Sequence, residues 1–174
     1  VCSLGGVGEA HYFHSQNLDP EEARRVRDDP YTTYIDWPNY HSGANGDAQA
    51  IRVEGERHPL LEGVDWLPAH PHEGAVGAPA ADPTARVIAT GLSKATGARF
   101  NLAVAFGGED GAGRAVAQST FHHFCDYNWD PRAGCPSFVD EAPGDEILRR
   151  PETLASAHRY VENLARWLSP AKPS

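Results

Sequence analysis

The stretch RAVAQSTFHHFCDYNWD, residues 114–130, decides how the rest of the chain is expected to fold. Residues 115–117 are small and apolar with no turn former among them, which predicts the end of a buried strand. Ser119 and Thr120 then interrupt the apolar run, and either is a good N-cap for a following helical turn. Four side chains that bind metals or transfer protons come directly afterwards: His122, His123, Cys125 and Asp126. Because ligands of open α/β sheets bind just beyond the carboxyl ends of strands, we expect a functional site here.

Two further apolar runs precede this strand, at residues 85–90 (ARVIAT) and 99–106 (RFNLAVAF). Glycine-containing turns separate these runs from each other and from residues 114–118, so the three are predicted to form an antiparallel meander. Residues 48–53 alternate Ala, Ile and Val with Gln and Arg, which predicts a half-buried strand. The sequence therefore predicts a sheet whose last strand leads into the histidine pair.

The clearest helical signal lies near the C-terminus, at residues 151–168. Pro151 suits the first turn of a helix, and Pro170 would end it. Apolar residues recur at intervals of three and four: Leu154, Ala157, Val161, Leu164, Ala165 and Leu168. We expect an amphipathic helix that packs on the sheet, with the three leucines and Val161 buried. His158 lies next to this stripe and is expected to pack rather than to catalyse.

Length and composition predict one domain that spans residues 1–174. The formal net charge of -9, with 15 scattered Lys and Arg residues, argues against nucleic acid as a partner. No apolar run approaches the ~20 residues that span a bilayer, so we expect no membrane association. The three cysteines form no CxxC pair, which favours reduced thiols in the cytoplasm, with a Cys125–Cys135 disulfide as the alternative. A small-molecule ligand is the partner that we expect.

The chain begins at Val1 and contains no methionine. We therefore expect it to be processed or to be the C-terminal part of a longer chain. Two macromolecular partners follow as alternatives, a second copy of the chain or a missing N-terminal portion.

Histidines also occur in two earlier segments. His11 and His14 follow the glycine turn at residues 5–8 with i, i+3 spacing. His72 and Glu73 belong to the sequence LPAHPHEG, in which two prolines restrict the backbone. The residue types H-x-H-E suit a metal or an acid–base site. Solvated polar loops and helix faces show the same patterns, so both interpretations stay open.

The order of these motifs resembles the trehalose-utilisation (ThuA-like) family of the class I glutamine amidotransferase-like superfamily. The motifs are the glycine turn followed by His11, then HPLLEGV (58–64), HPHEG (70–74) and GRAVAQSTFHH (113–123). The resemblance covers most of residues 1–126, corresponding to the C-terminal two-thirds of that domain. It implies a flavodoxin-like α/β sandwich, whose first βα units would lie in a missing portion or be absent from a reduced domain.

The resemblance also implies site residues. The Gly5–Gly6 turn matches the position of the nucleophile elbow, and His11 matches a histidine just after it. Glu73 matches an acidic residue in the loop after HPLLEGV, and His122 matches the superfamily histidine at the last strand end.

The chain departs from the amidotransferase pattern at two points. The elbow reads SLGGVG, with Cys2 several residues too early to be the nucleophile. Phe124 stands two residues after the matched histidine, where the orienting carboxylate is needed. Glutaminase activity is therefore not expected.

Two functions are consistent with the sequence. The first is an enzyme, a hydrolase or a lyase, that acts on a small polar, carbohydrate-derived molecule by metal-assisted or His/Glu acid–base chemistry. Its expected catalytic residues are His122, Glu73 and His72, and its expected metal ligands are His11, His72 and His122. Zinc is the expected divalent transition metal, because neutral histidines with an open position suit catalytic zinc.

The second function is a non-catalytic domain that binds a ligand or packs against the rest of a larger protein. In this alternative, the histidines satisfy backbone groups in ordered loops.

In the enzyme, only one of His122 and His123 can face a small cavity, because adjacent residues of a helical turn point ~100° apart.

Overall fold

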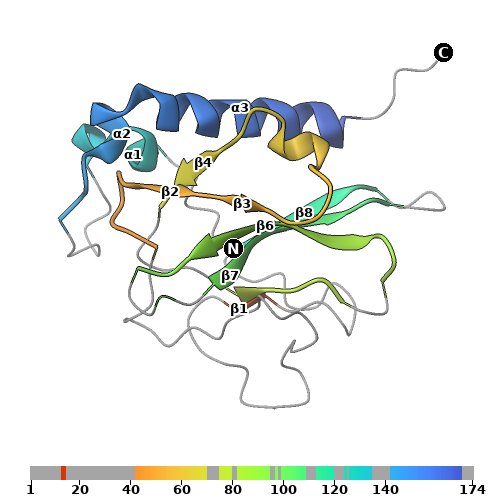
Figure 1. Ribbon diagram of the computed structural model, residues 1–174. Coiled ribbons are helices and arrows are strands. Elements are labelled where there is room, and N and C mark those ends of the chain that lie inside the picture. Colours follow the sequence, from red (N-terminus) through yellow and green to blue (C-terminus); the bar gives the residue numbers. More distant parts are fainter. Residues whose placement is uncertain are drawn as a thin grey trace.

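The computed structural model describes residues 13–14, 42–69, 75–79, 82–94, 97, 99–108, 113–119, 124, 126–134 and 142–169. Its strands are β1 (Phe13–His14), β2 (Ala48–Ala50), β3 (Arg52–Val53), β4 (Trp66–Pro68), β5 (Ala75–Val76), β6 (Ala85–Leu92), β7 (Arg99–Phe106) and β8 (Ala115–Gln118). Its helices are η2 (Pro59–Leu61), α1 (Asp126–Trp129), η4 (Pro131–Ala133), α2 (Glu146–Arg149) and α3 (Pro151–Leu168). Figure 1 shows α3 as a layer above the strands, with α1 and α2 beneath its N-terminal end. The chain thus combines helices with sheets in one layered arrangement.

The central sheet has the strand order β3-β6-β7-β8, and each neighbouring pair is antiparallel. The predicted meander is therefore confirmed. The strand predicted at residues 48–53 is interrupted at Ile51, whose N–H donates to Asp65 O at 3.0 Å. The interruption has a simple cause, because β2 pairs with β4 whereas β3 pairs with β6.

The turn that contains HPLLEGV anchors the core. Leu60 and Leu61 are fully buried in η2, between the sheet and α3. The His58 ring caps this 3-10 turn, because its Nδ1 accepts the Leu60 N–H at 3.2 Å. Pro59 occupies the first position of η2, where a backbone N–H would have no acceptor within the turn, so the proline costs no hydrogen bond.

Helix α3 has the predicted bounds, but its buried face differs from the predicted one. Leu168 is 43% exposed, which corrects the prediction that it is buried. Leu154, Val161 and Leu164 are only half-buried. The fully covered residues are Thr153, Ser156, Ala157, Tyr160 and Asn163.

Hydrogen bonds explain this polar inner face of α3. Ser156 Oγ accepts the N–H groups of Asp65 (3.0 Å) and Trp66 (2.9 Å), and it donates to Trp66 O at 2.8 Å. Asn163 Nδ2 donates to the carbonyl oxygens of Leu60 (3.2 Å) and Glu62 (2.9 Å). The helix therefore satisfies backbone groups of β4 and η2 that no sheet partner covers.

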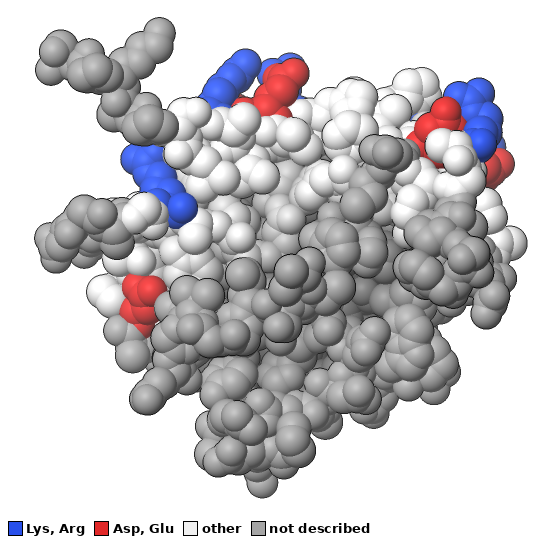
Figure 2. Space-filling view, turned by 180° about the vertical axis from the view of Figure 1, so that it is seen from behind, with Lys and Arg blue, Asp and Glu red and all other residues white. Residues whose placement is uncertain are grey.

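The described surface carries no extended basic region on the face shown in Figure 2, where acidic and basic side chains lie in small groups near the rims. Within the described ranges, no helix combines the length and the apolar character needed to cross a membrane. His158 is exposed at the surface of α3 and packs edge-on against Trp129, with ring centroids 4.9 Å apart. This contact matches the packing role expected for His158.

Candidate functional site

Buried polar side chains gather at one end of the central sheet. In the antiparallel meander, Leu92 at the end of β6 lies opposite Arg99 at the start of β7, and Gln118 at the end of β8 lies opposite Ala103, four residues further along β7. The side chains with 5% exposure or less at this end are Gln49, Thr90, Ser93, Asn101 and Ser119. We call this region the polar end of the sheet.

Every predicted catalytic and metal-binding residue lies outside the described residues. This holds for His11, His72, Glu73 and His122. It holds equally for His123 and Cys125, and Asp126 is described only as the first residue of α1. Their neighbours in sequence are described, and those neighbours provide the geometry.

The neighbours attach to adjacent residues of β7. Ser119 N–H donates to Leu102 O at 2.9 Å, three residues before His122. Asn101 Nδ2 donates to Val76 O at 2.9 Å, three residues after Glu73. The segment that contains Glu73 therefore ends beside Asn101, and the segment that contains His122 begins beside Leu102, the next residue of β7.

The segment that contains His11 reaches this part of the sheet through β1, which pairs with β5. In the β1–β5 pair, Phe13 lies opposite Val76 and His14 lies opposite Ala75. Phe13 follows His11 by two residues. The described ends of all three segments therefore meet at the polar end of the sheet.

A buried tyrosine holds both sides of the segment that contains His122. Gln118 Nε2 donates to the Tyr160 hydroxyl at 2.7 Å. The Phe124 ring stacks on the Tyr160 ring, with centroids 5.4 Å apart and an interplanar angle of 10°. Burial raises the pKa of Tyr160 to about 12, in spite of the hydrogen bond from Gln118, so the phenol stays neutral at physiological pH.

Two buried asparagines, one on α1 and one in the loop before β2, have amide atoms without a hydrogen-bond partner among the described residues. Asn128 on α1 is fully buried, and this holds for both its Oδ1 and its Nδ2. In the loop before β2, it holds for the buried Asn45 Oδ1. Leaving such a group unpaired costs about 1–3 kcal/mol, so each amide requires a partner from solvent, from another part of the chain or from a ligand.

The loop that carries Asn45 is clamped against the segment before α2. Asn45 O accepts the Gly144 N–H at 2.7 Å, and Gly46 O accepts the Ile147 N–H at 2.9 Å. At Gly46, φ is +91°, and an added Cβ would meet both Gly144 O and Pro131 Cγ. These contacts place the Asn45 loop beside η4, directly after α1.

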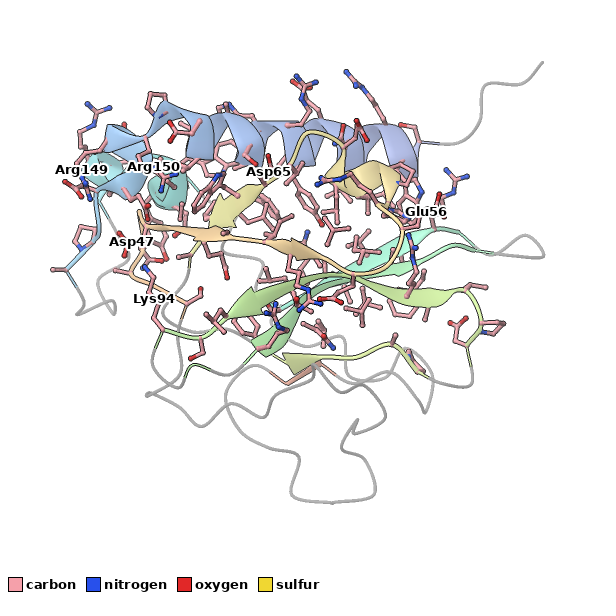
Figure 3. The ribbon with its side chains drawn as sticks, in the orientation of Figure 1. Asp47, Glu56, Asp65, Lys94, Arg149 and Arg150 are labelled. Atoms are coloured by element: carbon pink, nitrogen blue, oxygen red, sulfur yellow. The ribbon has the colours of Figure 1, made fainter. Side chains whose placement is uncertain are left out.

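Charged side chains complete this clamp. Glu146 Oε2 accepts the Ala48 N–H at 3.0 Å, and Glu146 Oε1 lies 2.6 Å from Arg150 Nη1. Burial alone would raise the pKa of Glu146, but these two hydrogen bonds outweigh it and lower the pKa. Lys94, just past β6, faces Asp47 with Nζ 3.8 Å from Oδ2 (Figure 3).

Sequence reasoning identified the strand that leads to this site but missed Asn45 and Asn128. A single asparagine in a loop or a short helix carries no periodic signal, so only the structure could reveal its burial. Among the residues that the structure describes, no group of three or more His, Cys, Asp or Glu side chains could hold a metal ion. Comparisons with protein-family models, curated proteins and solved structures gave no match for this chain.

Proposed function

We propose that the polar end of the sheet binds a small polar molecule, and that His122, Glu73 and His72 act on it. The observation that supports this proposal is that the segments containing His11, Glu73 and His122 all attach to the same end of the central sheet. The described neighbours of His122 and Glu73 bond to Leu102 and Asn101, and β1, which follows His11, pairs with β5. Residues so far apart in sequence have no local reason to share an attachment point.

In this proposal, the histidines supply a base and the carboxylate orients it. A neutral His122 would accept a proton from the bound molecule or from water, and Glu73 would stabilise the resulting imidazolium. In the metal-assisted form, His11, His72 and His122 would hold a divalent transition metal, zinc in preference. A bound zinc ion supplies an activated water at neutral pH. Both forms are typical of hydrolases and lyases.

The unsatisfied amide of Asn128 supports ligand binding independently. A primary amide can donate two hydrogen bonds and accept two, so Asn128 suits a ligand that carries hydroxyl or carbonyl groups. This favours a small polar, carbohydrate-derived molecule over an apolar one.

We also propose membership of the ThuA-like family and a flavodoxin-like arrangement. The HPLLEGV turn with its buried leucines and the strand before His122 support the proposal. The described strand pairs are all antiparallel, so the parallel strands of such a sheet would have to come from residues outside the described ranges. An experimental structure that paired residues 1–4 in parallel with a central strand would support this assignment, and an entirely antiparallel sheet would refute it.

A non-catalytic role is the alternative, and the same amide of Asn128 is compatible with it. A domain of that kind would bind the ligand without turnover, alone, as a homo-oligomer or as part of a longer protein. The cysteine pattern leads us to propose the cytoplasm as the compartment.

Metal analysis tests the proposed chemistry. We expect zinc to co-purify in stoichiometric amount with the wild-type protein and to be lost from the His122→Ala variant. His158→Ala is the matched control, because His158 is an exposed histidine on α3 whose ring packs against Trp129. Equal zinc content in all three proteins would refute His122 as a ligand.

A metal-free wild-type protein would exclude the zinc form and leave the His/Glu acid–base form. That form predicts nuclear Overhauser contacts between the side chains of His122 and either His72 or Glu73. Without such contacts, the proposed site would be wrong and the non-catalytic alternative would stand.

A further inference from the structure

A groove at the opposite end of β8 from Ser119 is lined by arginines. It has a volume of about 540 Å³ and lies between η2, the start of β8 and the C-terminal half of α3. Its polar and aromatic lining comprises Arg57, Glu62, Arg114, Asn163, Arg166 and Trp167. We call it the arginine groove. In Figure 1, η2 lies below the C-terminal end of α3, far from α1 and α2.

Two of the guanidinium groups are held in place by backbone carbonyls. Arg57 Nη1 donates to Leu61 O at 2.6 Å and to Val64 O at 3.3 Å. Arg114 Nη1 donates to Trp167 O at 2.8 Å, and its guanidinium lies over the Trp167 ring, 5.3 Å from the centroid. Held in this way, both groups lose little freedom when an anion binds.

Arg114 and Arg166 keep most of their N–H donors available to a ligand. A guanidinium has five N–H groups, and the hydrogen bond to Trp167 O is the only one that Arg114 makes to the described residues. Arg166 is 72% exposed, and its Nη2 lies 3.8 Å from Glu162 Oε2, which also accepts from Arg159. An incoming anion can therefore bind Arg114 and Arg166 without breaking a buried hydrogen bond.

Three arginines and one carboxylate, that of Glu62, line the groove, and Arg57 Nη2 also lies 3.6 Å from Asp65 Oδ1. The His58 ring packs edge-on against Trp167, with centroids 5.1 Å apart. Partial burial lowers the pKa of His58, and the charges of Arg86 and Arg114 lower it further. The His58 ring therefore lies beside Trp167 and within the electrostatic influence of Arg114, two residues of the groove lining.

We propose that the arginine groove binds the phosphate group of a small phosphate monoester. Planar guanidinium groups bind phosphate oxygens in pairs, and a dianion matches two arginines better than a single carboxylate does. The volume exceeds what inorganic phosphate needs, so the groove has room for the organic part beside Trp167. The acidic chain as a whole makes a nucleic-acid strand a poor match.

The test is titration calorimetry with glycerol 3-phosphate and with inorganic phosphate, at constant ionic strength and with glycerol as the uncharged control. We expect both phosphates to bind the wild-type protein, the ester more tightly, and glycerol not to bind. The Arg114→Gln/Arg166→Gln double variant should bind at least about tenfold more weakly. Arg149→Gln is the matched control. Arg149 is 66% exposed, pairs with Asp145 and lies on α2, beside the N-terminal end of α3 and far from the groove (Figure 3).

The ring signals of His58 in NMR spectra provide a second measurement that locates the ligand. Phosphate binding at the groove should shift the His58 signals in the wild-type protein and in the Arg149→Gln variant. Circular dichroism will show whether the double variant is folded, and if it is not, the single variant Arg166→Gln replaces it. Absence of binding, equal binding by the folded arginine variants, or unchanged His58 signals would overturn the proposal.

Discussion

The hydroxyl of Tyr160 accepts a hydrogen bond of 2.7 Å from the amide of Gln118, and this contact ties helix α3 to the last residue of β8. Tyr160 is fully buried, and Phe124 stacks on its ring. One side chain of the helix therefore fixes both the strand end and the residue that follows the histidine pair. The position of the proposed site depends on this tyrosine.

We predict that Tyr160→Phe lowers the free energy of unfolding by about 1–2 kcal/mol, because the Gln118 amide loses its buried acceptor. For a chain of this size, the melting temperature should fall by about 2–4 °C per kcal/mol. Urea denaturation and calorimetry measure both quantities. A variant as stable as the wild-type protein would show that the Gln118 amide finds another partner.

The same tyrosine makes the free energy of unfolding depend on pH in the alkaline range. Burial raises the pKa of Tyr160 to about 12, above the value of about 10 in the unfolded chain. Between these two values the unfolded state releases the phenol proton and the folded state keeps it, so stability falls as pH rises from about 10 to about 12. Urea denaturation at pH 9, 10 and 11 should give a shallower decline for Tyr160→Phe than for the wild-type protein, and parallel curves would refute the assignment.

Ser156 gives a second prediction on α3. Its hydroxyl makes three hydrogen bonds to the backbone of β4, which uses its full capacity. Ser156→Ala leaves two N–H groups and one carbonyl unpaired, so we expect a loss of about 2–4 kcal/mol. Ser169→Ala is the control, because exposed Ser169 makes one bond to Ala165 O and should cost less than about 0.5 kcal/mol. Similar losses in the two variants would contradict this account.

The extent of helix α3 could be predicted from its sequence, but its buried face could not. The stripe of leucines indicates a helix because apolar side chains recur at its period. The face that packs is set by the backbone groups opposite it, which Ser156 and Asn163 satisfy. Those groups belong to segments about 90 to 100 residues earlier in the chain, and no local pattern reports them.

The meander was predictable because each of its strands is a continuous apolar run between glycine turns. The break at Ile51 was not, because it reflects a change of partner from β4 to β6. At the candidate site, the sequence indicated the strand end at Ser119 and the histidines beyond it. It gave no indication of the buried amides of Asn45 and Asn128, since burial depends on which elements cover a residue.

Gly144 provides a prediction about the clamp beside the polar end. A Cβ at this position would overlap the carboxylate of Asp47. Gly144→Ala must displace this carboxylate, which accepts the Ala44 N–H at 3.2 Å and lies 3.8 Å from Lys94 Nζ, so we expect a loss of about 1–2 kcal/mol. Gly113→Ala is the matched control, because a Cβ there meets nothing within 4 Å, and it should change stability by less than about 0.5 kcal/mol. Thermal melts of both variants decide the question, and a wild-type melting temperature for Gly144→Ala would mean that the clamp is not rigid.

The last prediction compares two buried asparagines. Asn163 donates both amide hydrogens to backbone carbonyls, whereas the side-chain amide of Asn128 has no hydrogen-bond partner in the part of the chain that the structure describes. Replacing Asn163 with Leu removes two satisfied bonds and should cost about 2–3 kcal/mol. Replacing Asn128 with Leu removes a buried polar group that gains nothing in the free protein, so stability should stay the same or rise.

This contrast separates a structural asparagine from one that awaits a ligand. If Asn128→Leu were as destabilising as Asn163→Leu, the Asn128 amide would be paired in solution and would not support the proposed site. If it were stabilising, the wild-type protein would be retaining an unfavourable group on α1. A polar ligand that supplies those hydrogen bonds is the reason we propose for such a group, and Asn128→Leu should then abolish its binding while the fold persists.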